Sequence, residues 1–300
     1  MISKKILMIG NSFSICVGKN LPDIVLEAGH SLKLVSAYIG GCSLSRHVEN
    51  LEKAGTDPDF KPYDYRAWTI RNGRVVMSDP EKANLDVFLK DDLYDIVTIQ
   101  QASPLSWDWN TYQPSADRLI SAVRAAQPQA EIVVQQTWSY RTQDPRLDGE
   151  WGFGQDGMFR RLDEAYGRLA GEYGFRRIPT GHAVQITRER TPEKDRFHKI
   201  APEKMAEFRW PDLPCQAGDV VGAMAWRRSP EGGLIISQDN IHLNKRGEYL
   251  QACVWFGALF GGDPRTIRWT PDFLSDGDAS FLRECAFEAL VREGLFPSGK

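Results

Sequence analysis

The sequence predicts an α/β fold, in which helices cover both faces of a central, mostly parallel sheet. Short apolar runs that end in glycine or other turn-forming residues alternate with segments whose apolar residues recur every three to four positions. This alternation is typical of parallel sheets held between two helical layers. The length of 300 residues fits one domain of this class. We therefore expect residues 1–300 to form a single three-layer domain.

The strands are predicted from the apolar runs. Residues 6–9 are all apolar and are followed by Gly10, which is typical of a strand buried on both faces. The pair Asn72-Gly73 between two short runs is the signature of a type I′ turn, and it predicts a hairpin over residues 69–77. Similar runs predict strands at residues 32–39, 94–100, 131–137, 175–178 and 234–237.

Helices are predicted where apolar residues share one face. Leu21, Ile24, Val25 and Ala28 follow the spacing i, i+3, i+4, i+7, and Gly29 closes the stripe. Comparable patterns predict helices near residues 116–123, 158–169, 245–260 and 278–292. The segment 188–231 breaks the pattern, since it holds five of the 17 prolines and has no clean period. Such segments inside a domain are usually functional or disordered, so we expect a long loop or an inserted lid.

Composition excludes several classes of protein. The net charge is −3 and no basic tract is present, which argues against a nucleic-acid partner and against binding to an anionic membrane. The five cysteines are widely spaced, and the apolar run after the N-terminal lysines is too short for a secretory leader. We therefore expect a cytoplasmic protein. The histidines lack metal-binding spacing, so neither a metal nor another cofactor is expected.

Polar and glycine residues follow the predicted strands, at the edge where ligands bind in parallel sheets. Ser12 follows the first strand and precedes a helix, which suits either a ligand-facing hydroxyl or a simple helix cap. Gly40-Gly41 after the second strand allows close approach of a ligand, or only a tight turn. Amide pairs follow the next two strands and predict a polar site at this edge, or buried caps of the sheet: Gln100-Gln101 and Gln135-Gln136.

A carboxylate and an imidazole stand close together late in the chain. Asp239 and His242 are three residues apart, so they share a face on a helical turn or tight loop. A carboxylate in this position can hold the tautomer of the imidazole, while the other ring nitrogen takes a proton from a nucleophile. The alternative is a surface capping pair.

Together these residues resemble the motifs of the SGNH (GDSL-type) hydrolase superfamily. Gly10-Asn11-Ser12 resembles the first block, Gly41 the glycine of the second, and Asp239-x-x-His242 the last. The resemblance covers roughly residues 1–185 and 234–262, and implies a flavodoxin-like three-layer fold. The finer pattern is similar to a branch described as a domain of unknown function, and it rests on three runs: Gly41 to Leu44 with His47, Gln136 to Tyr140, and Leu250 to Phe260.

The resemblance implies a serine hydrolase with a catalytic triad and no cofactor. Ser12 is then the nucleophile, His242 the general base and Asp239 the residue that orients it. The backbone N–H groups of Ser12 and Gly41 are the implied donors to the oxyanion. This chain lacks the asparagine of the usual third block, so Gln101, or else Gln100, is expected to supply the third donor. The remaining expected substrate contacts are Asn11, Gln100, His47, Gln136 and Trp138.

The expected substrate is a short acyl ester, most simply an O-acetyl group on a carbohydrate. The carbohydrate is expected from tryptophans near the strand ends, among them Trp107, Trp109 and Trp138, whose faces suit sugar rings. The O-acetyl ester is what the resemblance implies, since such esters are a frequent substrate class of the superfamily. Two alternatives use the same fold: a glycan-binding protein without turnover, and an acyltransferase in which the segment 188–231 excludes water. A nucleotide-binding domain is disfavoured because neither glycine-rich phosphate motif is present. The sequence does not predict the oligomeric state.

Overall fold

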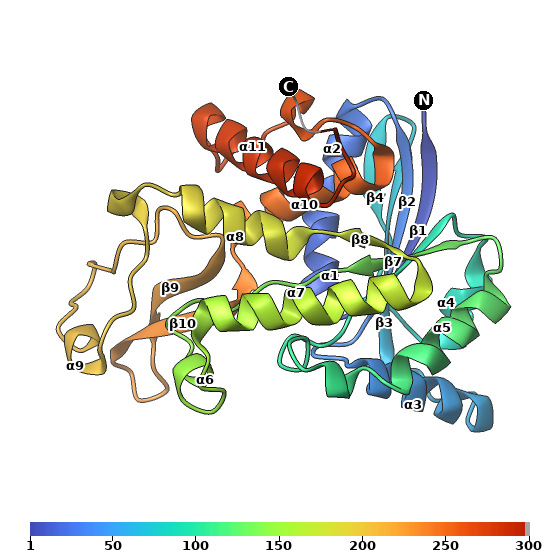
Figure 1. Cartoon of the computed structure of the whole chain (residues 1–300), viewed down its shortest axis with the longest axis horizontal. Coiled ribbons are helices and arrows are strands. Elements are labelled where there is room, and N and C mark those ends of the chain that lie inside the picture. Colours follow the sequence, from blue (N-terminus) through green and yellow to red (C-terminus); the bar gives the residue numbers. More distant parts are fainter. Residues whose placement is uncertain (298–300) are drawn as a thin grey trace.

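The structure, a computed structural model, describes residues 1–297 and confirms the predicted α/β architecture (Figure 1). The strands of the main sheet run in the order β4-β3-β2-β1-β6-β7-β8, and β5 pairs with β3. The central strands are parallel, whereas β3 is antiparallel to β2. The strands are β1 Ser3–Gly10, β2 Ser31–Tyr38, β3 Tyr63–Arg71, β4 Arg74–Met77, β5 Glu81–Ala83, β6 Ile96–Ile99, β7 Glu131–Gln135 and β8 Arg176–Ile178.

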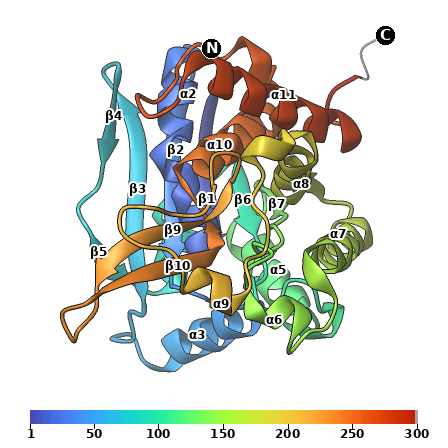
Figure 2. The ribbon, with the colours of Figure 1, turned by 90° about the vertical axis from the view of Figure 1, so that its left-hand side faces the viewer.

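Helices form the outer layers. In Figures 1 and 2, α2, α8, α10 and α11 gather on one face of the sheet, and α3, α4 and α5 on the other. The helices are α1 Ser12–Ile15, α2 Leu21–Glu27, α3 Leu44–Thr56, α4 Leu85–Asp91, α5 Ser115–Ala126, α6 Pro145–Asp148, α7 Gly154–Tyr173, α8 Thr180–Arg190, α9 Pro202–Met205, α10 Lys245–Phe260 and α11 Asp276–Arg292. Short 3-10 helices are η1 Cys16–Lys19, η2 Trp109–Thr111, η3 Glu193–Asp195 and η4 Pro264–Thr266.

The core lies between the sheet and the helical layers. The apolar residues of β1 are almost completely buried, as the apolar run predicts. Helix α10 is buried from Gly247 to Phe260, because it packs between α2, α8 and α11. The predicted hairpin turn is confirmed, since Asn72 and Gly73 both have positive φ values, of 50° and 69°. Among the helices of the described residues, none is long and apolar enough to cross a membrane.

The segment 188–231 contains regular structure that its sequence did not predict. Its first residues complete α8, and it then includes η3, α9 and the strand β9, Val221–Arg228. Strand β9 pairs antiparallel with β10, Leu234–Leu243, in a separate two-stranded ribbon. Both views show this ribbon outside the main sheet, on the side of the molecule that carries α9 (Figure 2).

Asp239 and His242 lie on a strand, and the prediction of a helical turn or tight loop was wrong. In a regular strand, residues three positions apart face opposite sides. The pairing of β10 with β9 is regular only up to Asp239, and an irregularity separates Asp239 from Leu243. Such bulges redirect side chains at the ends of strands. This one lets the two side chains meet.

Candidate active site

Three side chains from opposite ends of the chain form a continuous line of hydrogen bonds. The Oγ of Ser12 lies 2.9 Å from Nε2 of His242, although 230 residues separate them. The Nδ1 of the same ring lies 2.9 Å from Oδ2 of Asp239. A hydroxyl, an imidazole and a carboxylate in this order can activate the hydroxyl as a nucleophile.

Ser12 is placed by the turn between β1 and α1. It is the first residue of α1, and Asn11 caps this helix by accepting a hydrogen bond from the N–H of Phe13 at 3.0 Å. The amide of Asn11 also donates to the carbonyl of Cys42, which joins the ends of β1 and β2. Asn11 is 1% exposed, and both the nitrogen and the oxygen of its amide have partners inside the protein. The expected substrate contact of Asn11 is therefore wrong, and its role is to shape the turn.

The carboxylate of Asp239 is held in its ionised form. His242 hydrogen-bonds to it through the ring, and the backbone N–H groups of His242 and Ile241 donate to Oδ1 at 3.0 and 2.9 Å. These bonds, with the imidazole bond the largest, hold the pKa of Asp239 well below its ordinary value, against the opposing effect of burial. The side chains of Asp239 and His242 are 46% and 40% exposed, so the pair is open to solvent.

Two backbone N–H groups at this edge have no acceptor among the described residues. The N–H of Ser12 is in the first turn of α1, where no intrahelical acceptor exists. The N–H of Gly41 also makes no internal hydrogen bond. Gly41 has a φ of +61°, in the left-handed region that favours glycine, and it is exposed. Both groups can therefore donate to a ligand.

Gln101 does not have the predicted free amide. Its Nε2 donates to the carbonyl and the hydroxyl of Thr111, at 2.9 and 3.2 Å. Its Oε1 accepts from the N–H groups of Leu44 and Ala102, at 3.0 and 2.9 Å. The prediction that Gln101 donates to an oxyanion is thus wrong, because both of its donor hydrogens already have acceptors. The side chain instead links the start of α3 to the loop after β6.

Replacement of Gln101 by Ala should therefore lower stability. It would leave buried N–H groups of Leu44 and Ala102 without partners, so we expect the free energy of unfolding to fall by about 3 kcal/mol. Chemical denaturation measures this change. The control is Gln238→Ala, since Gln238 is exposed and its side chain makes no internal hydrogen bond in the described part of the chain. A Gln101→Ala protein as stable as the wild type would contradict the structural role.

The side chain of Gln100 is also hydrogen-bonded inside the protein. Its Nε2 donates to Oδ1 of Asn11 at 2.7 Å, and the residue is 1% exposed. Gln100 therefore supports the Asn11 cap of α1 and does not donate to substrate. The alternative prediction, that Gln100 is the third donor to the oxyanion, was also wrong. Gln135 and Gln251 act similarly, because both donate to the carbonyl of Phe13 at 2.8 Å. Buried amides from β7 and α10 therefore fix the helix that carries Ser12.

Two further predicted substrate contacts are internal. His47 is completely buried, with Nδ1 2.9 Å from the hydroxyl of Tyr63, and burial lowers its pKa to about 3. Gln136 is also completely buried, donating to Asp163 and accepting from the N–H of His182. Neither side chain reaches the surface that a substrate would contact. The predictions for His47 and Gln136 were therefore wrong.

Trp138 is a positioning residue, and the prediction that it contacts substrate was wrong. It is completely buried and stacks on Phe13, with ring centroids 4.1 Å apart. Its indole N–H donates to the carbonyl of Ile241 at 2.9 Å. Phe13 also contacts the ring of His242 edge-on, at 5.6 Å. Trp138 therefore packs against Phe13, the neighbour of Ser12, and hydrogen-bonds to Ile241, the neighbour of His242. The sequence analysis missed this role.

An open cleft adjoins the exposed side of this constellation. It has a volume of about 450 Å³ and includes Asp239 and His242. Among its lining residues only Ile241 is apolar, and the others include Arg146, Arg227 and Gln238. Arg146 is held by a two-point ion pair with Asp144. No group of three or more His, Cys, Asp or Glu side chains within residues 1–297 is arranged to hold a metal ion.

Comparison with solved structures supports the fold. A DUF4886 family protein from Bacteroides uniformis has 24% sequence identity and a TM-score of 0.75, and the match covers 97% of this chain and 95% of that one. A proposed SGNH hydrolase from Slackia heliotrinireducens has 18% identity and a TM-score of 0.50, covering 86% of this chain and 99% of that one. A comparison with curated proteins gives no match.

The sequence also matches a family over most of its length. Residues 5–199 match the family described as "Domain of unknown function (DUF4886)". These residues include Ser12 and Gly41, whereas Asp239 and His242 lie beyond the matched region. The chain belongs to the DUF4886 family and has the fold of the SGNH hydrolases.

Proposed function

We propose that this protein is a serine hydrolase that cleaves carboxylic esters. The observation that carries the proposal is the pair of 2.9 Å contacts that link Ser12, His242 and Asp239. A hydroxyl that is hydrogen-bonded to an imidazole, itself oriented by a carboxylate, meets the geometric criteria for a nucleophile and its base, and it lies at the strand ends where ligands bind in such sheets. The similarity in fold to a proposed SGNH hydrolase supports the same conclusion.

The geometry suggests the following sequence of bonds. The Oγ of Ser12 attacks the acyl carbon, and Nε2 of His242 takes the hydroxyl proton. The tetrahedral intermediate collapses, its bond to the alcohol oxygen breaks, and the imidazolium gives its proton to the departing alcohol. Water then attacks the acyl-serine ester with the same proton transfers, which releases the acid and restores Ser12. Asp239 stays ionised and stabilises the imidazolium.

The developing oxyanion is stabilised by backbone groups in this proposal. The N–H groups of Ser12 and Gly41 have no internal acceptor within the described residues. Hydrogen bonds that strengthen as charge develops lower the barrier, and loss of one such donor commonly costs about 10²–10³ in rate. Because Gln100 and Gln101 are engaged elsewhere, the proposed hole has two donors from the protein.

We further propose a short acyl ester of a polar alcohol as substrate, with an O-acetylated carbohydrate as the expected class. The cleft beside Asp239 and His242 is lined almost entirely by polar side chains. Guanidinium and amide groups there can hydrogen-bond to hydroxyls of a sugar, whereas a long acyl chain needs an apolar groove. Trp138 gives no support, since it is buried.

The substrate class is tested with two series of esters. We expect p-nitrophenyl acetate to be hydrolysed with a higher kcat/KM than the butyrate or decanoate ester. We also expect acetate release from acetylated xylose or glucose oligomers, followed by ion chromatography, at a higher kcat/KM than from ethyl acetate. Faster cleavage of decanoate than of acetate would contradict the short-acyl assignment. Equal kcat/KM for the sugar and ethyl esters would contradict the carbohydrate assignment.

A further inference from the structure

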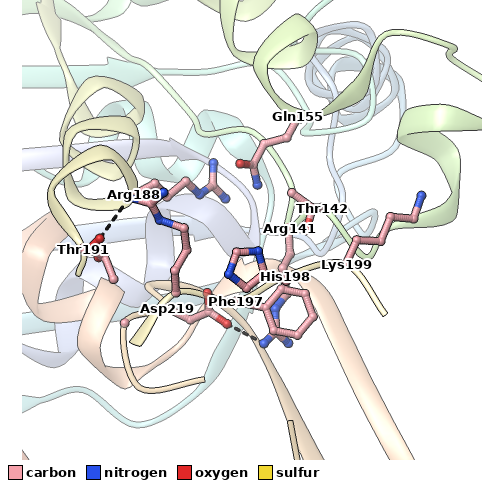
Figure 3. Close-up of a pocket in the computed structure, with 11 residues that line it drawn as sticks. Arg141, Thr142, Gln155, Arg188, Thr191, Phe197, His198, Lys199 and Asp219 are labelled. Atoms are coloured by element: carbon pink, nitrogen blue, oxygen red, sulfur yellow. Dashed lines mark hydrogen bonds and ion pairs between the residues drawn. The ribbon is translucent and has the colours of Figure 1, made fainter. Parts of the chain in front are cut away.

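A second cavity, separate from the open cleft, is lined in part by Arg141 and Thr142, which belong to the segment that follows β7. Its volume is about 320 Å³, and its walls come from α7, the end of α8 and the segment 196–219 (Figure 3). Figure 3 shows Arg141, Arg188, Phe197, His198 and Asp219 gathered around it. None of the residues that line this cavity lines the cleft beside the triad.

The deepest charged group of this cavity is Arg141. Its side chain is only 2% exposed and forms an ion pair with Asp219, whose side chain is 15% exposed. Its Nε and Nη1 atoms have no hydrogen-bond partner in the described residues. Buried guanidinium groups normally have all of their donors satisfied, because each unmet donor costs free energy. Two unmet donors on one buried cation therefore point to an acceptor from outside the chain.

Other groups around Arg141 add positive charge and polarity. Arg188 lines the same cavity and donates to Ser139 and to the carbonyl of Tyr140. Within residues 1–297 it forms no direct ion pair with a carboxylate. Thr142 also lines the cavity, and its buried Oγ1 has no hydrogen-bond partner within residues 1–297. The two arginines thus share one largely buried carboxylate, that of Asp219, because the carboxylate of Asp156, which also acts on Arg188, is exposed to solvent. A second negative charge would balance them.

The acidic groups near the entrance do not supply that charge. Lys199 pairs with Asp148, while Arg196 and His198 both contact Glu193. The ring of Phe197 lies 3.5 Å from the guanidinium of Arg141 and covers its face. The cavity therefore combines the apolar ring of Phe197, the planar guanidinium donors of the two arginines and the hydroxyl of Thr142. This combination suits a small organic anion better than a bare ion.

We infer that this cavity binds a small molecule through a carboxylate or phosphate group. Arg141 and Arg188 pair with the oxygens of that group, and Thr142 and Asp219 are placed for its hydroxyls. The inference does not depend on ester hydrolysis. The site adjoins the triad, however, since the backbone N–H of Arg141 donates to the carbonyl of Asn240 at 2.8 Å, between Asp239 and His242.

The inference is tested by isothermal titration calorimetry of the wild-type protein at constant ionic strength. The probes are sodium glucuronate and inorganic phosphate, with glucose as the neutral control. We expect saturable binding of one anion per chain and no binding of glucose. Tighter binding of glucuronate would assign the site to a sugar acid, and tighter binding of phosphate would assign it to a phosphorylated ligand. Absence of saturable binding by both anions would overturn the inference.

A matched pair of variants locates the binding. Thr142→Asp places a carboxylate beside Arg141, whereas Thr142→Asn has nearly the same shape without the charge. We expect anion affinity to fall by about tenfold or more in the Asp variant, because like charges repel, and to change little in the Asn variant. If Thr142→Asp does not fold, the pair Lys199→Glu and Lys199→Gln gives the same comparison at the exposed entrance. Equal affinity in a charged variant and its neutral match would overturn the inference.

Discussion

Replacement of Ser12 by Ala is expected to lower kcat for p-nitrophenyl acetate by about 10⁴-fold or more. The substitution removes the proposed nucleophile and leaves its neighbours in place. The cap of α1 comes from Asn11, and the anchors of Phe13 come from Gln135 and Gln251. None of these contacts uses the hydroxyl of Ser12, so the melting temperature should stay within a few degrees of the wild type.

The control for this experiment is Ser280→Ala. Ser280 is exposed on α11, outside the candidate site, and its hydroxyl makes no hydrogen bond in the described residues. We expect wild-type kcat and KM for this control. Equal rates for wild type and Ser12→Ala would show that the hydrolysis arises elsewhere on the protein.

Replacement of Asp239 by Asn is expected to lower kcat by about 10³-fold, with little change in KM. The amide can donate to Nδ1 of His242 and so favour the wrong tautomer, which leaves Nε2 protonated and unable to accept the proton of Ser12. The carboxylate also stabilises the imidazolium, and the amide does not. The expected loss in kcat is smaller than the loss of about 10⁴-fold for a buried triad aspartate. Asp239 is 46% exposed, so solvent screens its charge.

The pH dependence follows from the lowered pKa of Asp239. Because its pKa in the folded protein is below the ordinary value of about 3.9, the carboxylate is ionised throughout the neutral range. Its stabilising contribution is present above about pH 4 and is lost as the pH falls through the lowered pKa. The amide of the Asp239→Asn variant does not titrate, so raising the pH from 6 to 9 should not restore its turnover. Full recovery at pH 9, or wild-type kcat at pH 7, would contradict the assigned role.

The matched control for this substitution is Asp263→Asn. Asp263 caps the short helix η4 and pairs with Arg265, outside the candidate site. Its pKa is also lowered, chiefly by the hydrogen bond from Arg265. The control therefore removes a carboxylate of similar ionisation and should leave kcat unchanged.

The central sheet and the proximity of Ser12 to Gly41 could be predicted, because both follow from simple periodicity and topology. Apolar runs such as residues 6–9 mark strands that are buried on both faces, and the ends of parallel strands share one edge. Ser12 and Gly41 follow two neighbouring strands, β1 and β2, so their proximity requires only the strand order. The position of His242 relies on the resemblance to SGNH motifs, since the sequence spacing alone left a surface pair open.

The roles of the buried polar residues could not be predicted from sequence. Gln101 follows β6 and His47 lies in α3, which comes after β2. Both satisfy groups inside the protein, since Gln101 bonds to backbone N–H groups and His47 to Tyr63. Every buried backbone N–H needs an acceptor, and the choice of acceptor depends on packing between segments far apart in sequence. A strand-end amide is therefore equally compatible with a ligand and with an internal partner.

The structure of residues 188–231 was missed for a different reason. Strand β9 is paired only in a two-stranded ribbon, so it lacks the continuous apolar run of a buried strand. Its partner β10 is largely exposed up to Gln238, and only an irregularity in the pairing brings Asp239 and His242 together. Pairings of this kind depend on long-range contacts that local periodicity does not encode.

The central claim is that Ser12 is a nucleophile activated by His242. The most direct measurement is labelling with a fluorophosphonate, which forms a stable bond to an activated serine, followed by peptide mass spectrometry. We predict one label per chain on the peptide that contains Ser12, none on Ser12→Ala, and labelling slowed by at least about 10²-fold in His242→Ala. Absence of label on Ser12 in a protein that hydrolyses esters, or equal rates of labelling in wild type and His242→Ala, would contradict the claim.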